Sequence, residues 1–174
     1  MKPKAHHVAA AALATFTGAV IYGQVNSTDT LTRVIDGDTI IVNGSTRVRL
    51  FGIDAPELGQ PCTKANGMIW DCGAAAKKYL ESFFMLKNVT VKCDKKSQDN
   101  YGRSVRQCFV INADGQRHDI AKSLVASGYA VDYRHFSNGA YADDESYARQ
   151  HHLGIWSGQF EMPWTYRHEQ GGVK

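Results

Sequence analysis

Five charged residues have the types and spacing needed to act on a phosphate. Asp38, Arg49, Asp54 and Glu57 lie in one short stretch of the chain, and Arg103 follows in a later segment. Carboxylate oxygens are the ligands that calcium and magnesium prefer, and a guanidinium group can hold a phosphate through two parallel hydrogen bonds. Glu57 lies three residues after Asp54 and could orient or deprotonate a water molecule beside a metal ion. The set therefore predicts metal-assisted chemistry on a phosphate group.

Each of these residues also has an ordinary structural interpretation when it is considered alone. Asp-Gly is common in turns, which accounts for Asp36 and Asp38, and an arginine often forms a surface ion pair of little energetic value, ~0 to 1 kcal/mol. Glu57 could be an exposed loop carboxylate. The prediction depends on the whole set, and the chain must bring its members together.

The stretch Val34–Glu57 has the pattern of a β-hairpin, because apolar and polar residues alternate on both sides of Asn43-Gly44. A two-residue turn would place Asp38 opposite Arg49. A three-residue loop, which also includes Ser45, would place Ile40 opposite Val48 and bury more apolar surface on one face. We favour the three-residue loop, and either register brings an acid and an arginine together at the open end.

The sequence contains four cysteines, Cys62, Cys72, Cys93 and Cys108. In an exported protein they would be oxidised. We expect Cys62 to pair with Cys72 and Cys93 with Cys108, because each pair falls within one local unit. A zinc site is disfavoured, because no two cysteines are two residues apart and no histidine lies near them at finger spacing.

The N-terminus has the features of an export signal. Lys2 and Lys4 precede an apolar run from Val8 to Tyr22 that is short for a membrane span. We interpret residues 1–23 as a signal peptide, with an uncleaved membrane anchor as the alternative, and the polar residues 24–30 as a linker. The location would then be secreted or periplasmic, and a membrane would be involved only if the leader is uncleaved.

The mature chain would be nearly neutral. The formal charge of +3 comes from 20 basic and 17 acidic residues, and removal of Lys2 and Lys4 leaves 18 basic residues and a charge of about +1. A polyanion would therefore be bound by arginines at particular positions and not by a uniformly basic surface.

The remaining sequence predicts a mixed fold. Apolar residues at helical spacing predict helices over 73–86 and from Asp119 to Gly128, and alternation predicts strands over 89–93 and 104–111. A third helix is predicted over 140–152, because acids lie in its first turn and basic residues in its last. The segment 58–72 has the composition of a loop, and Trp156 and Trp164 are expected to pack the C-terminal segment onto the domain. Short strands with helices between them favour a mainly β fold with α (α+β): a five-stranded OB-type β-barrel with three helices packed outside. We expect one domain over residues 31–167 and a C-terminal tail over 168–174.

The charged residues lie in motifs that resemble those of the staphylococcal nuclease (thermonuclease-like) family. The resemblance covers about Thr32 to Trp156 and rests on VIDGDT at 34–39, VRLFGIDAPE at 48–57, DNYGR at 99–103 and GIW at 154–156. It implies a calcium-dependent, sequence-nonspecific nuclease that hydrolyses DNA and RNA and leaves 3′-phosphate and 5′-hydroxyl ends. Asp38 and Asp54 match the family's calcium carboxylates, and Ala55 stands where the family uses a backbone carbonyl as a further ligand.

The resemblance also implies catalytic roles. Glu57 matches the proposed general base, and Arg49 and Arg103 match the arginines that bind the phosphate and stabilise the transition state. The family also places tyrosines around the nucleotide. Tyr129, Tyr133 and Tyr141 are the candidates in this sequence, and Tyr133 is the one we favour. Asn100 departs from the family, since many relatives have a basic residue there. The alternative function is a catalytically idle module of the same family that binds nucleic acid or another ligand.

Overall fold

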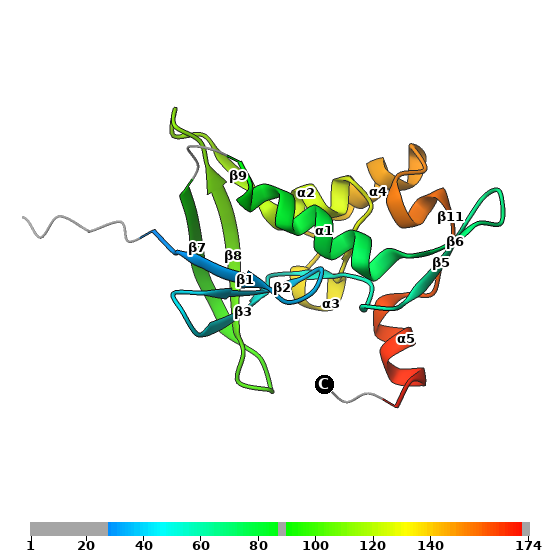
Figure 1. Ribbon diagram of the computed structural model, residues 1–174, viewed down its shortest axis with the longest axis horizontal. Helices are drawn as coiled ribbons and strands as arrows, with labels where there is room; N and C mark the ends of the chain where they lie inside the picture. Colours follow the sequence, from blue (N-terminus) through cyan, green and yellow to red (C-terminus); the bar gives the residue numbers. More distant parts are fainter. Residues whose placement is uncertain (1–27, 87–89, 172–174) are drawn as a thin grey trace, which may run out of the picture.

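The computed structural model describes residues 28–86 and 90–171, and these form a mixed α and β structure with five α-helices (Figure 1). The strands are β1 (Leu31–Val34), β2 (Thr39–Val42), β3 (Thr46–Leu50), β4 (Ile53–Asp54), β5 (Pro61–Lys64), β6 (Ile69–Asp71), β7 (Thr90–Gln98), β8 (Ser104–Ile111), β9 (Arg117–Asp119), β10 (Val131–Asp132) and β11 (Gly158–Gln159). The helices are α1 (Cys72–Phe84), α2 (Ile120–Ala126), α3 (Arg134–Ser137), α4 (Ala142–Gln150) and α5 (Pro163–Glu169), with a 3-10 helix, η1, over Gly154–Ser157.

The main sheet joins the hairpin that carries the acids to a second hairpin. Its order is β1-β2-β3-β8-β7, with β9 also paired to β8. Ile40 pairs with Val48 and Val42 with Thr46, so the first hairpin closes through a three-residue loop and its predicted register is confirmed. The parallel pairing of β3 with β8 brings the segment that contains Arg103 beside the strand that contains Arg49.

Both predicted disulfides are present in the structure. Cys93 and Cys108 lie directly opposite each other on β7 and β8 and are bonded. Cys62 is bonded to Cys72. All four cysteines of the sequence are therefore paired.

The three predicted helices correspond to α1, α2 and α4. Side-chain capping explains where α1 and α2 begin. Asp71 accepts a hydrogen bond from the amide of Ala74 at 2.8 Å, and Asp119 accepts one from the amide of Lys122 at 3.2 Å. Such caps satisfy amides that have no partner within the first helical turn. The short helices α3 and α5 are additional to the three that were predicted. They have too few turns to show a clear apolar period.

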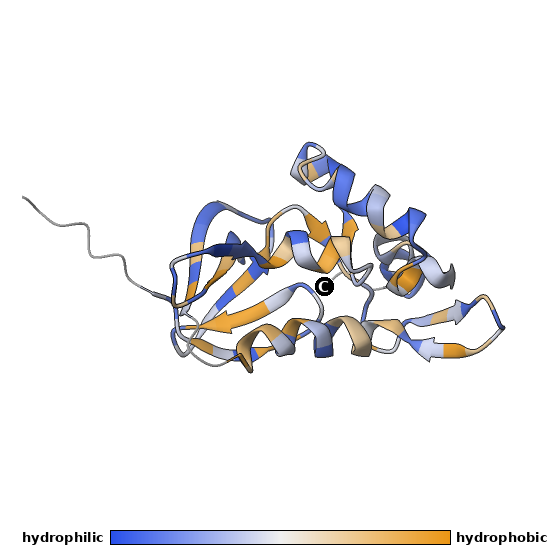
Figure 2. Ribbon diagram, turned by 90° about the horizontal axis from the view of Figure 1, so that it is seen from above, coloured by the Kyte–Doolittle hydropathy of each residue, from blue (hydrophilic) through white to orange (hydrophobic). Residues whose placement is uncertain are grey.

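The prediction of a loop over residues 58–72 is wrong in part. The segment contains a hairpin, in which Cys62 of β5 pairs with Trp70 of β6, and it projects away from the main sheet beyond the end of α1 in two perpendicular views (Figures 1 and 2). The hairpin is stabilised by contacts from distant parts of the sequence, since β11 pairs with β5 and the Cys62–Cys72 bond joins its base to α1. Turn-forming residues between the strands hid the pairing from local sequence analysis.

Two groups of buried side chains form the interior. The larger lies between the main sheet and the helices, and its fully buried members include Ile40, Leu50, Leu80, Ile120 and Leu124. The smaller surrounds the Cys62–Cys72 bond and is packed by Trp70, Trp156, Phe160, Met162 and Trp164. The predicted packing role of Trp156 and Trp164 is confirmed.

The expected leader, residues 1–23, lies outside the described residues, as does most of the expected linker. Within residues 28–86 and 90–171, no helix has the length and apolar character required to cross a membrane. Asp29, near the end of the expected linker, already contacts the domain, because its amide donates to the carbonyl of Val91 at 2.8 Å. The helix α5 extends to Glu169, beyond the start of the expected tail.

Candidate active site

The first hairpin brings Asp38 to the segment that contains Asp54 and Ala55. The carbonyl of Asp38 accepts a hydrogen bond from the amide of Leu50 at 2.8 Å, which extends the strand pairing to its open end. The Asp38 side chain is nearly inaccessible, and its Oδ2 accepts a hydrogen bond from the amide of Ala55 at 3.2 Å. The acid is therefore held against the backbone of the second part of the motif.

Gly37 permits this close approach. A Cβ atom on Gly37 would lie 2.6 Å from Cβ of Ala55 and 2.8 Å from Cβ of Ala76, which is closer than carbon atoms pack in protein interiors. The glycine of the Asp-Gly-Asp motif is thus required by packing against α1 and the Asp54–Ala55 segment.

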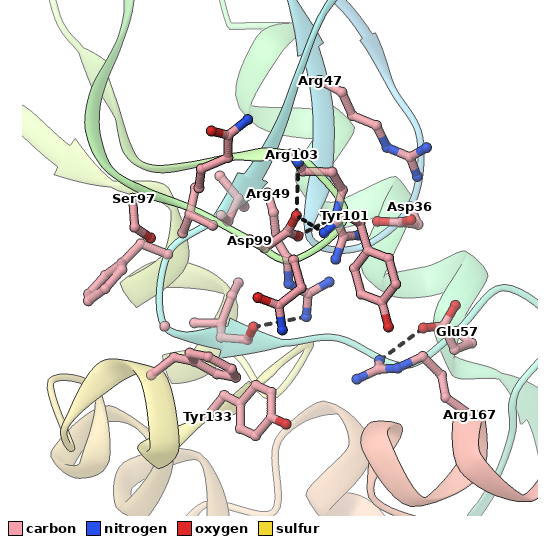
Figure 3. A pocket seen from close by; sticks show the side chains of 18 residues that line it. Asp36, Arg47, Arg49, Glu57, Ser97, Asp99, Tyr101, Arg103, Tyr133 and Arg167 are labelled. Carbon is pink, nitrogen blue, oxygen red and sulfur yellow. Dashed lines mark hydrogen bonds and ion pairs between the residues drawn. The ribbon is translucent and has the colours of Figure 1, made fainter. Parts of the chain in front are cut away.

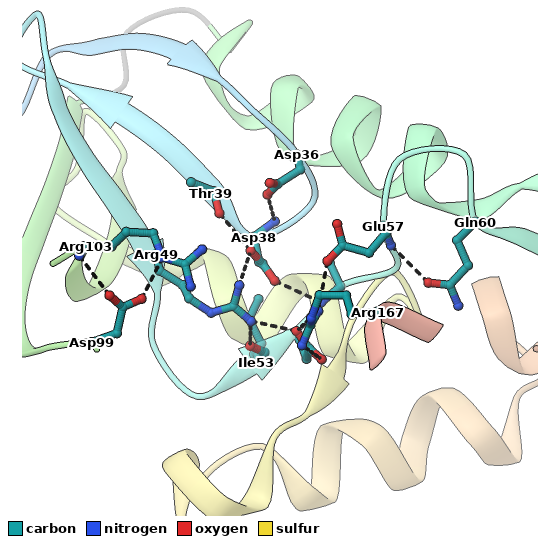
Figure 4. A network of polar contacts seen from close by, with 12 residues as sticks. Asp36, Asp38, Thr39, Arg49, Ile53, Glu57, Gln60, Asp99, Arg103 and Arg167 are labelled. Carbon is teal, nitrogen blue, oxygen red and sulfur yellow. Dashed lines mark hydrogen bonds and ion pairs between the residues drawn. The ribbon is translucent and has the colours of Figure 1, made fainter. Parts of the chain in front are cut away.

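Arg49 connects the two expected metal carboxylates. Its Nη1 donates to Oδ1 of Asp38 at 2.8 Å, and its Nη2 donates to Oδ1 of Asp54 at 2.6 Å (Figure 4). The Asp54 side chain has no exposed surface, and the Arg49 side chain is 15% exposed. The two carboxylates and one guanidinium that the hairpin pattern predicted to converge do so.

Arg167 is a second arginine in the same network, and sequence analysis did not identify it. Its Nη1 donates to Oδ1 of Asp54 and to Oε1 of Glu57, both at 2.9 Å, and its Nη2 donates to Oδ2 of Asp54 at 2.8 Å. Arg167 lies on α5, 113 residues along the chain from Asp54. No local pattern indicates that Arg167 contacts these acids. The one signal was its position near Trp156 and Trp164, which were expected to pack the C-terminal segment onto the domain.

Glu57 is positioned by its backbone as well as by Arg167. Its amide donates to Oε1 of Gln60 at 3.0 Å, and Nε2 of Gln60 donates to the carbonyl of Glu161 at 2.7 Å. Gln60 is completely buried. This side chain, also missed by sequence analysis, connects the predicted general base to the C-terminal segment.

Arg103 reaches the same region from the β7–β8 turn but is not part of the Arg49 network. Its Nε donates to Oδ2 of Asp99 at 2.6 Å, and its amide donates to Oδ1 of Asp99 at 2.8 Å. Arg103 and Arg49 both line a cleft of about 430 Å³, together with Glu57, Tyr133 and Arg167 (Figure 3). The structure thus brings Asp38, Arg49, Asp54 and Glu57 into a single network through Arg167 and places Arg103 in the lining of the same cleft.

The structure separates the three candidate tyrosines. Tyr133 lines the cleft, because β10 pairs with β4 and the Tyr133 amide donates to the carbonyl of Gly52 at 2.9 Å. Tyr129 is stacked on Tyr79 with ring centroids 4.6 Å apart, and Tyr141 is only 3% exposed. Among these three, Tyr133 is the one that lines the cleft.

Burial and neighbouring charges shift the pKa values of three aspartates at the site. Burial and the charge of Asp38 raise the pKa of Asp36 to about 6. Burial also acts to raise the pKa of Asp38, but the charge of Arg49 and the hydrogen bonds from Ala55 and Thr39 outweigh it, so this pKa is lowered. Burial raises the pKa of Asp54 against the opposing effect of the arginines. Three carboxylates, on Asp38, Asp54 and Glu57, thus contact the guanidinium groups of Arg49 and Arg167. Asp36 lies close enough to Asp38 and Glu57 to interact with their charges.

The donor atoms fit a hard divalent cation. Asp38, Asp54 and the carbonyl of Ala55 could supply oxygen ligands of the kind that calcium binds, with water and phosphate oxygens completing the shell. Within the described part of the chain, no group of three or more His, Cys, Asp or Glu side chains is arranged to hold a metal ion. A site here would use two carboxylates and one backbone carbonyl, which is the ligand set that the family resemblance implies.

The fold and the cleft define a small α+β protein with arginine-bridged carboxylates at the open end of a β-hairpin. The sequence model of the family described as staphylococcal nuclease homologue matches residues 47–158. The chain belongs to this staphylococcal nuclease-like family.

Several curated proteins are similar to the chain. A micrococcal nuclease from Shigella flexneri is 33% identical over 146 residues, which cover 78% of this chain and 77% of that protein. The succinoglycan biosynthesis protein ExoI from Rhizobium meliloti (strain 1021) is 39% identical over 128 residues, which cover 74% of this chain but only 64% of that protein's length. A thermonuclease from Staphylococcus intermedius is 37% identical over 76 residues, covering 42% of this chain and 43% of that protein.

Proposed function

We propose that this chain is an exported, calcium-dependent nuclease that hydrolyses the phosphodiester bonds of DNA and RNA without sequence specificity. The observation that carries the proposal is the single ion-pair network of Asp38, Arg49, Asp54 and Glu57 at a cleft that Arg103 also lines. Membership of the staphylococcal nuclease-like family supports it, as do relatives that are named nucleases.

The residues of the cleft have complementary roles in the proposed reaction. Calcium bound by Asp38, Asp54 and the Ala55 carbonyl would supply positive charge next to the phosphate oxygens. Glu57 accepts a proton from a water molecule, whose oxygen then attacks phosphorus. The bond between phosphorus and the 5′-oxygen breaks, and that oxygen takes up a proton, which leaves a 3′-phosphate and a 5′-hydroxyl end.

The arginines act on the charge that develops at phosphorus. Arg49 is held by buried carboxylates and Arg103 by Asp99, so both guanidinium groups are oriented before substrate binds. Groups oriented in advance stabilise a transition state without a cost of reorganisation. Tyr133 offers an aromatic ring for a neighbouring base, a contact that tolerates any sequence.

We also propose that residues 31–167 form one domain and that its main sheet is a five-stranded barrel of the OB type. The strands would be β1, β2, β3, β8 and β7, in that order around the barrel. An isolated bridge between Asp29 and Val91 supports closure, because it joins the segment before β1 to β7 at the opposite edge of the sheet.

Export is proposed from the leader and the cysteines together. Two disulfides among four cysteines suit an oxidising compartment outside the cytoplasm. N-terminal sequencing of secreted or periplasmic material would show whether residues 1–23 are removed. A full-length N-terminus recovered from membranes would indicate the anchored alternative.

The decisive test is cleavage of plasmid DNA and RNA by the mature chain, with calcium and with chelator. We expect degradation with calcium, its arrest by chelator, and 5′-hydroxyl ends on the fragments. Glu57→Gln should lower kcat by about 100-fold or more, as loss of a general base does. The matched control is Glu81→Gln, since the Glu81 side chain is 46% exposed on α1, and this variant should retain wild-type activity. Degradation that persists in chelator would refute the calcium requirement.

The alternative is a catalytically idle module that binds nucleic acid or another ligand. The observation that favours it is that guanidinium groups already contact the carboxylates of the site. The Glu57→Gln comparison separates the two functions, because equal behaviour of the variant and the wild type in binding and cleavage assays would indicate binding alone.

A further inference from the structure

The most unusual feature of the site is the arginine that reaches it from the last helix. Arg167 contacts both oxygens of Asp54 and one oxygen of Glu57, at 2.8 to 2.9 Å. A guanidinium bound to both oxygens of a carboxylate is the strongest form of such a pair. Arg167 therefore occupies part of the carboxylate surface that a cation at this site would use.

The position of Arg167 is built into the fold. The C-terminal segment is held by the β11–β5 pairing and by the hydrogen bond from Gln60 to the carbonyl of Glu161. The ring of Trp164 stacks on that of Tyr133, with centroids 5.3 Å apart and planes 13° apart. Three separate contacts thus place α5 at the cleft, and the Arg167 side chain is only 21% exposed there.

The charges around Arg167 set it in competition with a cation. Asp54 is completely buried, so its carboxylate requires positively charged or hydrogen-bonding partners in every state of the protein. Arg49 contacts Oδ1 of Asp54, whereas Arg167 contacts both Oδ1 and Oδ2. A divalent cation that binds Asp54 would meet the positive charge of Arg167 at close range, and the two cations repel each other.

We propose that Arg167 is a positioning residue that takes the place of the cation: it holds Asp54 and Glu57 when no divalent cation is bound, and it is displaced when one binds. This inference rests on the proposed function, since it concerns the same cation site. Arg167 weakens the affinity for the cation and couples the occupancy of the site to the position of α5.

The direct test is calorimetric titration of calcium into the mature protein without nucleic acid. Arg167→Gln removes the charge and keeps a polar side chain of similar length, and it should bind calcium at least about tenfold more tightly than the wild type. A tenfold change in affinity corresponds to about 1.4 kcal/mol of binding free energy. Arg167→Lys keeps the charge but cannot bind both oxygens of Asp54 in the fork geometry, so its affinity should lie between the two.

Arg117→Gln is the control for loss of an arginine. Arg117 forms an exposed ion pair with Asp94 at 2.8 Å and packs over Phe109, on β9. This variant should bind calcium as the wild type does. Circular dichroism establishes that each variant is folded, and if Arg167→Gln does not fold, the comparison of Arg167→Lys with the wild type carries the test.

A second readout follows the movement of α5. Calcium should change the tryptophan fluorescence of the wild type, because Trp164 stacks on Tyr133 and lies three residues before Arg167, and Trp164→Phe should remove most of that change. If the wild type binds calcium and Arg167→Gln binds it equally or more weakly, the inference about Arg167 is overturned and the proposed calcium dependence still stands. If neither protein binds calcium, the proposed cation dependence fails and the inference fails with it.

Discussion

The buried side chain of Gln60 makes a quantitative prediction about how the active-site segment is held. Gln60 is completely buried and accepts a hydrogen bond from the amide of Glu57 at 3.0 Å while donating one to the carbonyl of Glu161 at 2.7 Å. Gln60→Leu keeps the approximate volume and removes both hydrogen bonds. The amide of Glu57 and the carbonyl of Glu161 lose these partners at partly buried positions.

The expected cost follows from those two interactions. A buried polar group that loses its partner costs about 1 to 3 kcal/mol, partly offset by the apolar surface that leucine buries, so the free energy of unfolding should fall by about 2 to 4 kcal/mol. For a domain of this size each 1 kcal/mol corresponds to about 3 to 4 °C, which gives a fall of about 6 to 16 °C in Tm. Cleavage activity should fall as well, because Glu57 and α5 both lose an attachment.

Urea denaturation measures the change in stability. The control is Gln150→Leu at the exposed end of α4, where the amide contacts Ser146 at 3.0 Å on the surface, and this variant should stay within about 0.5 kcal/mol of the wild type. A Gln60→Leu protein as stable as its control would refute the argument that Gln60 joins the active-site segment to the C-terminal segment.

Three further predictions concern the surroundings of the site. Gly37→Ala places a methyl group 2.6 Å from Cβ of Ala55 and 2.8 Å from Cβ of Ala76. The substitution should lower the free energy of unfolding by about 1 to 3 kcal/mol and reduce cleavage, because it displaces Asp38. An unchanged Tm and unchanged activity would contradict the packing described for Gly37. Replacing Cys93 and Cys108 by serine opens a loop with a sequence separation of 15 residues. In the chain-entropy account this should lower the free energy of unfolding, measured in urea, by about 3 kcal/mol. Peptide mapping that linked Cys62 to Cys93 would contradict the pairing itself. Burial acts to raise the pKa of Asp99, but the hydrogen bonds from Arg103 outweigh this effect, so the pKa is lowered in the folded protein. The Asp99–Arg103 pair therefore stabilises the fold fully at pH values above the pKa of an unfolded aspartate, about 3.9. Asp99→Asn should therefore be less stable than the wild type at neutral pH, and the difference in Tm should disappear as the pH falls through the lowered pKa of Asp99; a difference independent of pH would show that the ion pair does not contribute.

Short-range features of the chain could be predicted from the sequence because their causes lie within a few residues. The alternation around Asn43-Gly44-Ser45 specified the hairpin register, since a shift of one residue would turn the apolar side chains to the other face. Asp119 marked the start of α2. The disulfides joined neighbouring cysteines, and the convergence of Asp38, Arg49 and Asp54 followed from that one hairpin and its extension.

Long-range features depended on the tertiary structure. Arg167 reaches Asp54 across 113 residues because α5 docks through contacts of Trp164, Gln60 and β11, none of which has a local signature. Tyr133 reaches the cleft, whereas Tyr129 and Tyr141 do not, because the β10–β4 pairing sets the direction of that segment. The sequence alone thus determined the hairpin and the charged residues it carries, since turn chemistry and apolar periodicity act between neighbours. Only the tertiary structure decided which distant side chains complete the site, because the burial that places them is shared among segments far apart in the chain.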